Sequence, residues 1–193
     1  MEECSEHEVL GLFQTNVFGV LAMVCAVLPY MRPQRSGIVT NIGSLAAWRS
    51  HVCTGMHCAT KFATAGITAG LREEVAHLGI DVTSIDLGSF RTELADNMMV
   101  AQQRIPYLDA GQETVSSFLS TLHGKQLGDP TKAAQFIMEI VTKTSRCEGL
   151  TLPPCLALGK DSVAYIRDAL QRTERMLEEW ADVVSMTEHD DVQ

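Results

Sequence analysis

The sequence has no run of Lys or Arg residues, and its formal net charge is −9. A surface of that charge repels phosphate groups, which excludes most proteins that bind nucleic acids or anionic membranes. We therefore expect no nucleic-acid partner and no membrane partner. A small-molecule substrate and other protein chains remain as the expected partners.

Cysteine pairs and long apolar runs are also missing. None of the six cysteines lies in a CxxC pair or at the spacing of a zinc site. We expect free thiols and no metal centre. The most apolar stretch, residues 17–31, is shorter than the roughly 20 residues that span a membrane, and the residues before it are acidic. These absences predict a soluble cytoplasmic protein.

What the sequence does contain is an alternation of helical and strand patterns. The predicted helices cover residues 6–31, 56–78, 131–142 and 161–183, and the predicted strands cover residues 38–42, 80–87 and 150–158. Strands separated by helices form parallel sheets through crossover connections. We therefore predict one α/β domain over residues 1–185, with helices layered on a parallel sheet, and a frayed acidic tail over residues 186–193.

Local signals refine this outline. Apolar residues surround most of the helix at 6–31, which predicts burial on more than one side, against a sheet and against another subunit. Residues 32–37 are predicted to form a polar turn. Gly66 and Gly70 lie one turn apart, which favours a close contact with another helix. The adjacent prolines in 150–158 predict that this strand lies at a sheet edge.

The candidate chemistry lies where two predicted strands end. Ser44 and Gly88 follow neighbouring strands, so both should lie at the carboxyl edge of the sheet, where open α/β folds bind ligands. His57 and Lys61 share one face of the next helix. A hydroxyl, an imidazole and an ammonium group can together move protons to or from a carbonyl or hydroxyl substrate. The ammonium group should lower the pKa of His57.

Four ordered segments resemble the classical short-chain dehydrogenase/reductases: residues 15–19 (TNVFG), 41–44 (NIGS), 57–61 (HCATK) and 86–92 (DLGSFRT). The resemblance implies that Asn16 holds a proton-relay water, that Ser44 binds the substrate carbonyl and that Lys61 binds the nicotinamide ribose. Together with Lys61, Gly88 and Thr92 match positions beside the cofactor.

The sequence departs from this family in two ways. His57 stands where the family has its catalytic tyrosine. The chain starts about where the family's fourth helix begins, so no glycine-rich TGxxxGxG turn, acidic ribose-binding residue or NNAG segment occurs in it. The resemblance therefore implies a partial Rossmann-like three-layer fold without the first βαβ half, and we expect no bound cofactor from these residues alone.

Three functions are compatible with this pattern. A non-redox isomerase, dehydratase or cyclase would use His57 as acid/base and Ser44 as hydrogen-bond donor, and Met98–Met99 suggests an apolar substrate. We place it first because Asn16, Ser44 and Lys61 are all present. An NAD(P)-dependent reductase whose N-terminal half is missing or supplied elsewhere is the alternative.

The third hypothesis is a non-catalytic subunit or relic. For any of the three, the resemblance implies a homodimer through the helices at 6–31 and 56–78, or a heterodimer with a full-length relative.

Overall fold

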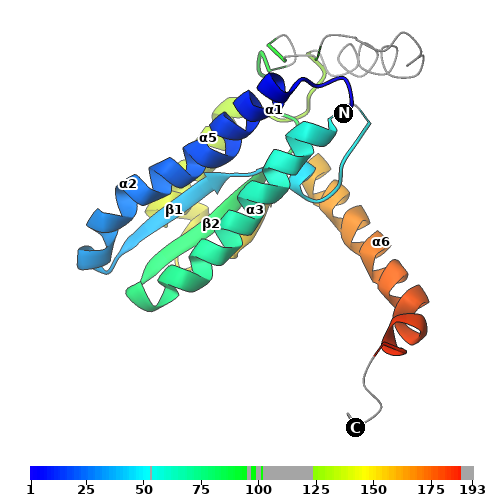
Figure 1. The fold of residues 1–193 in the computed structure, drawn as a ribbon. Helices are drawn as coiled ribbons and strands as arrows, with labels where there is room; N and C mark the ends of the chain where they lie inside the picture. Colours follow the sequence, from blue (N-terminus) through cyan, green and yellow to red (C-terminus); the bar gives the residue numbers. More distant parts are fainter. Residues whose placement is uncertain (53, 95–96, 99–100, 102–123, 188–193) are drawn as a thin grey trace.

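Helices and strands alternate along the chain, as the sequence predicts. The structure is a computed structural model that describes residues 1–52, 54–94, 97–98, 101 and 124–187 (Figure 1). The described elements, in chain order, are α1 (Glu6–Phe13), a π-helix (Gln14–Phe18), α2 (Gly19–Gln34), β1 (Gly37–Ile42), a 3-10 helix (Leu45–Ala47), α3 (Gly55–Val75), a 3-10 helix (Ala76–Leu78), β2 (Ile80–Leu87), α5 (Pro130–Thr142), a 3-10 helix (Ser145–Cys147), β3 (Cys155–Leu158) and α6 (Lys160–Ser185).

The sheet is parallel and has the strand order β1-β2-β3. Pairing between β1 and β2 runs from Gly37–Ile80 to Ile42–Ile85, and β2 then pairs with β3 over its last four residues. Both pairs are parallel, so the strand ends that precede Ser44 and Gly88 lie at one edge. The predicted partial Rossmann-like α/β fold is therefore confirmed.

Two apolar clusters cover the two faces of the sheet. One joins α2 and α3 to the strands through residues such as Leu28, Leu71 and Val82. The other joins α5 to the opposite face through Ile85 and Ile140. Figure 1 shows α2 and α3 side by side on one face, with α5 behind the strands. The result is the predicted three-layer arrangement.

The first helical segment is longer than the sequence suggests. It continues through Arg32–Gln34, so the prediction of a polar turn over residues 32–37 is wrong for its first half. The helix ends at Arg35, which adopts a left-handed conformation (φ 49°) and donates its backbone N–H to the Arg32 carbonyl. Its guanidinium also bonds the His77 carbonyl. A turn set by an arginine lacks the usual glycine signal.

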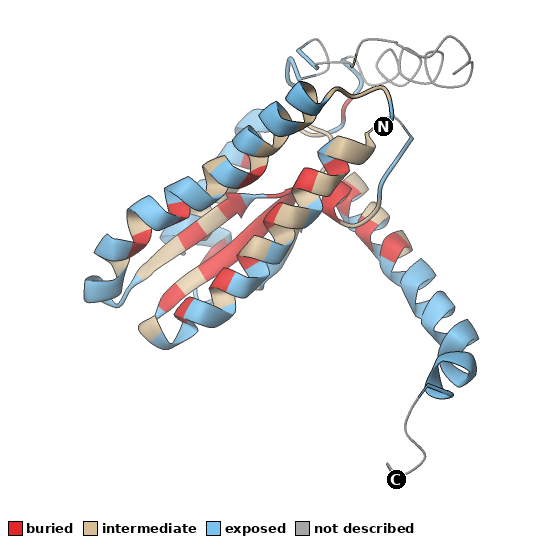
Figure 2. Cartoon of the chain, in the orientation of Figure 1, coloured by how far each residue is buried: buried red, intermediate tan, exposed pale blue. Residues whose placement is uncertain are grey.

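Only one face of this segment is buried in the chain. Val17, Val24 and Leu28 face the interior, whereas Met23 and Tyr30 are exposed (Figure 2). Within the chain the segment is buried on one side only, and no described residue covers its outer face. Burial of that face against another subunit stays a prediction. Residues Glu6–Gln34 are also long and apolar enough to cross a membrane by composition, a criterion that core helices of soluble proteins meet as well.

The third strand is shorter than predicted, at Cys155–Leu158, and it does lie at a sheet edge. Pro153 and Pro154 precede it and have no backbone N–H to donate. They serve instead as acceptors, since Thr83 Oγ1 donates to the Pro153 carbonyl at 2.8 Å and the Ser84 N–H to the Pro154 carbonyl at 3.0 Å. The two prolines thus attach the segment before the edge strand to β2, but they do not extend the strand itself.

The surroundings of Gly66 and Gly70 also differ from the prediction. A Cβ atom built at either glycine would meet nothing within 4 Å. The predicted close contact is therefore absent within the described chain.

A row of threonines forms part of the contact of α3 with the rest of the fold. Thr60, Thr64 and Thr68 recur every fourth residue and are almost completely buried. Thr68 Oγ1 accepts a hydrogen bond from Asn41 Nδ2 on β1 at 2.9 Å and donates to the Thr64 carbonyl at 2.7 Å. Both partners of this contact are buried, so the polar groups satisfy one another inside the protein.

Replacing Thr68 with Val tests this contact. Valine has nearly the same shape but leaves the buried Asn41 amide without its acceptor, so the free energy of unfolding should fall by about 1–3 kcal/mol. Thr142→Val is the matched control, since that hydroxyl is exposed and bonds only its own helix carbonyl and Thr144. Urea denaturation measures both. Equal losses in the two variants would contradict the role given to Thr68.

Candidate active site

Ser44 follows β1 and caps the 3-10 helix Leu45–Ala47. Its Oγ accepts the backbone N–H of Ala46 at 3.1 Å. The hydroxyl hydrogen is not used in that bond, so it remains free to donate to an oxygen atom at the sheet edge. The local fold therefore presents Ser44 as a hydrogen-bond donor.

His57 and Lys61 lie one turn apart near the start of α3, as predicted. The Lys61 Nζ donates to the carbonyl of Ile42, the last residue of β1, at 3.1 Å. α3 also contacts the 3-10 helix that Ser44 caps. The structure thus brings the start of α3 to the strand end that carries Ser44.

The electrostatics of this corner favour a neutral imidazole. Desolvation by the surrounding protein lowers the pKa of His57, and the Lys61 ammonium lowers it further. The His57 residue is nevertheless exposed, so solvent screens part of this effect. An ordinary histidine has a pKa near 6.5, so the lowered value leaves His57 predominantly neutral at about pH 7.

Two opposing effects act on the pKa of the second basic group, the Lys61 ammonium. Burial lowers the pKa of Lys61, and the negative charge of Asp86 opposes that shift. Asp86 is only 2% exposed. It accepts hydrogen bonds from Ser84 Oγ at 2.6 Å and from the Trp48 indole N–H at 2.7 Å. A buried carboxylate therefore lies beneath the site, with donors on both oxygens.

Sequence reasoning did not single out Asp86, although it lies in one of the family-like segments. The available signal was an acidic residue near the end of an otherwise buried strand, which only a partner or a function would maintain. Its surroundings also explain Gly43. A Cβ atom there would lie 2.0 Å from Asp86 Oδ1 and 2.3 Å from Ser84 Oγ. No other residue fits between Ile42 and Ser44 without displacing that carboxylate.

Asn16 lies in the π-helix between α1 and α2. Its side-chain N–H donates to Thr60 Oγ1 at 3.1 Å, and its backbone carbonyl accepts a hydrogen bond from Thr64 Oγ1 at 3.1 Å. Thr60 Oγ1 in turn donates to the His57 carbonyl at 2.7 Å. Asn16 therefore braces α3 next to His57. A proton-relay water held by Asn16 stays a prediction.

The two remaining family-like positions lie beyond β2. The Gly88 N–H donates to the Leu158 carbonyl at 2.8 Å, and a Cβ at Gly88 would lie 2.2 Å from Asp161 Oδ1. Asp161, in the first turn of α6, also accepts the Ser89 N–H at 2.6 Å. Thr92 is exposed, and its hydroxyl accepts the Leu94 N–H at 3.3 Å. Gly88 thus lies at the expected edge, whereas no contact joins Thr92 to the described site.

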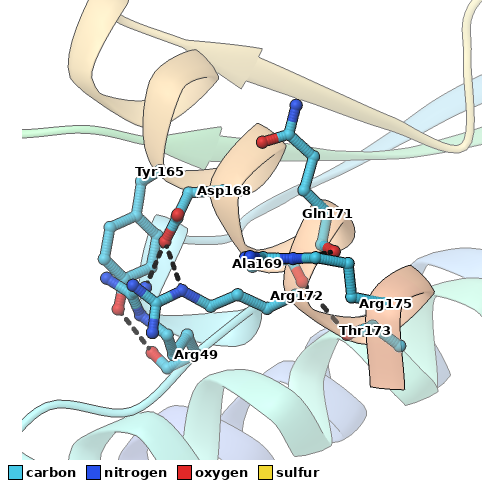
Figure 3. A network of polar contacts seen from close by, with 8 residues as sticks. All are labelled: Arg49, Tyr165, Asp168, Ala169, Gln171, Arg172, Thr173 and Arg175. Carbon is cyan, nitrogen blue, oxygen red and sulfur yellow. Dashed lines mark hydrogen bonds and ion pairs between the residues drawn. The ribbon is translucent and has the colours of Figure 1, made fainter. Parts of the chain in front are cut away.

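The loop between Ser44 and α3 is held by α6 (Figure 3). Arg49 forms an ion pair with Asp168, and its guanidinium stacks over the Tyr165 ring at 4.4 Å. The Tyr165 hydroxyl donates to the Arg49 carbonyl at 2.9 Å, and the His51 ring lies 5.1 Å from the Tyr165 ring. His51 is thus a loop residue with a ring partner. Sequence reasoning missed this whole network, because its members are far apart in the chain.

The cysteine Cys53 and the apolar pair Met98–Met99 fall wholly or partly outside the described residues. Cys53 and Met99 are not described, and Met98 is exposed. Within the described part of the chain, no group of three or more His, Cys, Asp or Glu side chains could hold a metal ion.

The comparisons with known proteins agree with this arrangement. Residues 1–103 match the family model for short chain dehydrogenases. The chain belongs to the short chain dehydrogenase family. It is similar to a short-chain dehydrogenase from Streptomyces avermitilis, with 34% identity and a TM-score of 0.81 over 98% of this chain and 66% of that structure.

Curated relatives match in part. The chain is 28% identical to Oxidoreductase BOA17 of Botryotinia fuckeliana over 188 residues, which cover 95% of this chain and 65% of the relative. It is 35% identical to an NADP-dependent 3-hydroxy acid dehydrogenase of Schizosaccharomyces pombe over 88 residues, or 46% of this chain and 34% of that protein. This family member therefore spans less than two thirds of the length of these curated relatives.

Removing the Lys61 charge tests the electrostatics of the site. In Lys61→Met the imidazole loses a neighbouring positive charge that repels its proton, so the pKa of His57 should rise toward its ordinary value. Lys61→Arg keeps the charge and should leave that pKa low. Titration of the imidazole by NMR measures it, and an unchanged pKa in Lys61→Met would contradict the coupling.

Gly43→Ala tests the close approach to Asp86. The added methyl group would overlap the carboxylate, so the free energy of unfolding should fall by about 1–3 kcal/mol or more. Gly11→Ala in α1 meets nothing within 4 Å. It should instead stabilise its helix by up to about 1 kcal/mol. Thermal or urea unfolding distinguishes the two, and a neutral Gly43→Ala would refute the packing argument.

Proposed function

We propose that these residues form the substrate side of an NAD(P)-dependent short-chain oxidoreductase that interconverts a hydroxyl and a carbonyl group. The observation that carries the proposal is the Lys61–Ile42 hydrogen bond, which places the start of α3, with His57, at the strand end followed by Ser44. Family membership and the names of the relatives, which are oxidoreductases and dehydrogenases, favour this function over the non-redox enzyme that the sequence placed first.

In this proposal each side chain has one task. Ser44 donates its free hydroxyl hydrogen to the substrate oxygen and orients it. A neutral His57 would accept the proton of the substrate hydroxyl as that group becomes a carbonyl. A nicotinamide held by Lys61 would supply the hydride acceptor that this oxidation requires. Desolvation, together with the Lys61 ammonium, favours the unprotonated imidazole that a base requires. The reverse reduction needs imidazolium, so oxidation is the direction that the lowered pKa of His57 favours near neutral pH.

The residues fit one half of the cofactor. Lys61 is half-buried, and its ammonium makes one described hydrogen bond, to Ile42. Its other N–H groups suit the hydroxyls of a ribose. No GxGxxG turn occurs in these 193 residues, and such a turn is the usual support for a pyrophosphate. Contacts to the pyrophosphate would therefore have to come from residues other than these.

A non-redox isomerase, dehydratase or cyclase is the second candidate. The observation in its favour is the identity of His57, an imidazole of lowered pKa at the position of the family's tyrosine. Such an enzyme would use His57 and Ser44 in the same roles, without a nicotinamide. A small, apolar, uncharged carbonyl or hydroxyl compound is the proposed substrate in either case.

We also propose a cytoplasmic location and association through α1–α2 and α3. Phe18, Leu21 and Met23 are exposed on α1–α2, and the space beside Gly66 and Gly70 on α3 is open. A second copy, or a full-length relative, would cover this apolar surface.

Cofactor binding and His57 chemistry can be tested together. Purified protein is titrated with NADH and NADPH by nicotinamide fluorescence, then assayed for oxidation of small apolar secondary alcohols. His57→Ala should lower turnover by about 10²–10⁴-fold, while binding persists. His77→Ala is the control, because this exposed histidine lies in the 3-10 helix that follows the far end of α3. Oxidation should also fall as the pH drops through the lowered pKa of His57, because the base becomes protonated.

The other outcomes separate the alternatives. Failure of both nucleotides to bind folded protein would rule out the proposal of hydride transfer. Turnover of a carbonyl compound without nicotinamide, lost in His57→Ala, would then favour the non-redox enzyme. Binding with activity unaffected by His57→Ala would show that His57 has no catalytic role.

A further inference from the structure

Asp86 is an acidic residue that the fold buries beside the candidate site. It lies near the end of β2 and is only 2% exposed. A carboxylate loses its hydration when it is buried, so its hydrogen bonds have to replace the lost water. In the proposed reaction Asp86 has no direct task. The groups that its carboxylate bonds therefore indicate what it contributes.

The side chain of Asp86 joins β2 to the turn that carries Ser44. The Trp48 indole N–H donates to Asp86 Oδ2 at 2.7 Å. Ser84 Oγ donates to Asp86 Oδ1 at 2.6 Å. Trp48 is the residue that ends the 3-10 helix Leu45–Ala47, and Ser44 is the residue that begins it. The carboxylate therefore bonds the far end of the short turn that starts at Ser44.

The same carboxylate restricts the near end of this turn. The Gly43 N–H donates to the Ile85 carbonyl at 2.9 Å. A Cβ atom at Gly43 would lie 2.0 Å from Asp86 Oδ1, so the Gly43 backbone passes directly over the carboxylate. Gly43 and Trp48 thus both contact Asp86. The position of Ser44, which lies between them in the chain, is fixed from both ends.

Asp86 is itself attached to a second layer of the fold. The buried Ser162 hydroxyl, in the first turn of α6, donates to the Asp86 backbone carbonyl at 2.7 Å. The residue after Trp48 is Arg49, which also reaches α6 through its ion pair with Asp168. The strand end and the end of the turn are therefore both held on α6. The carboxylate is a fixed point rather than a group that follows the turn.

We propose that Asp86 is a positioning residue. Through the Trp48 indole and the Gly43 backbone, its carboxylate fixes the turn that carries Ser44, and it thereby sets the direction in which the Ser44 hydroxyl donates. The consequence for catalysis rests on the proposed function, in which Ser44 binds the substrate oxygen. The fixing of the turn does not depend on that function, and it is separate from the effect of the Asp86 charge on Lys61.

The two tryptophans of the chain allow a direct test by hydrogen exchange. The Trp48 indole N–H bonds a buried carboxylate, whereas Trp180 on α6 is 54% exposed. In NMR spectra of the whole chain, the Trp48 indole hydrogen should exchange at least about tenfold more slowly than that of Trp180. Equal exchange of the two indoles would overturn the proposal.

Paired substitutions test whether this bond holds the turn. Trp48→Phe removes the indole donor but keeps an aromatic ring. The Ala47 N–H, which donates to the Ser44 carbonyl at 2.9 Å, should then exchange about tenfold faster. Trp180→Phe is the matched control and should leave Ala47 unchanged. Circular dichroism checks that each variant is folded. Unchanged exchange of Ala47 in folded Trp48→Phe would contradict the role of the bond.

Substitution of Asp86 separates the hydrogen bond from the charge. Asp86→Asn keeps an oxygen acceptor for the indole, so Ala47 should still exchange slowly. Asp86→Ala removes the acceptor and should accelerate the exchange of Ala47 as Trp48→Phe does. Slow exchange of Ala47 in folded Asp86→Ala would overturn the proposal.

Kinetics with NAD⁺ or NADP⁺ and a secondary alcohol test whether the turn acts through Ser44. Trp48→Phe should lower kcat/KM by about 10–10²-fold, because the hydroxyl is misplaced. In a Ser44→Ala background the same change should have almost no further effect, and full additivity would refute the positioning role. A wild type without turnover but with slow exchange at Ala47 would refute the proposed function alone, because the exchange of Ala47 does not depend on catalysis.

Discussion

The site depends on the packing of one helix face against two asparagines. Thr60, Thr64 and Thr68 on α3 are buried against Asn16 and Asn41, and each hydroxyl has a partner in this seam. Apolar side chains could fill the same space, but they would allow α3 to slide or rotate. The hydrogen bonds fix the rotation of the helix, and thereby fix which residues of its first turns meet the end of β1.

A chain of charges follows from that placement. Asp86 is buried with two hydrogen-bond donors, and its negative charge favours the ammonium form of Lys61. Lys61 in turn disfavours protonation of His57. Desolvation is the larger cause of the lowered pKa of His57, and the Lys61 charge adds to it.

The network around Asp168 links the site to the rest of the molecule. It connects the loop after Ser44 to α6, through side chains that are separated by more than a hundred residues in the sequence. The same helix leaves the domain only a few residues later. One surface element therefore supports the candidate site at its base, while its outer half is exposed.

The sequence by itself determined the order of the helices and strands, the parallel sheet and the positions of Ser44, His57 and Lys61. These features follow from local periodicity and from residue spacing, and both can be read from a short stretch of sequence. It misplaced the end of the first helix, because a left-handed Arg35 gives no glycine signal.

Only the tertiary structure decided that Asp86 lies beneath Gly43, that Asn16 bonds α3 and that α6 holds the loop through Arg49. Each of these contacts joins residues from different elements, and their distance in space depends on how the layers pack rather than on their spacing along the chain. The structure also decided which face of α1–α2 is buried, because amphipathic patterns show that a surface is apolar but not what covers it.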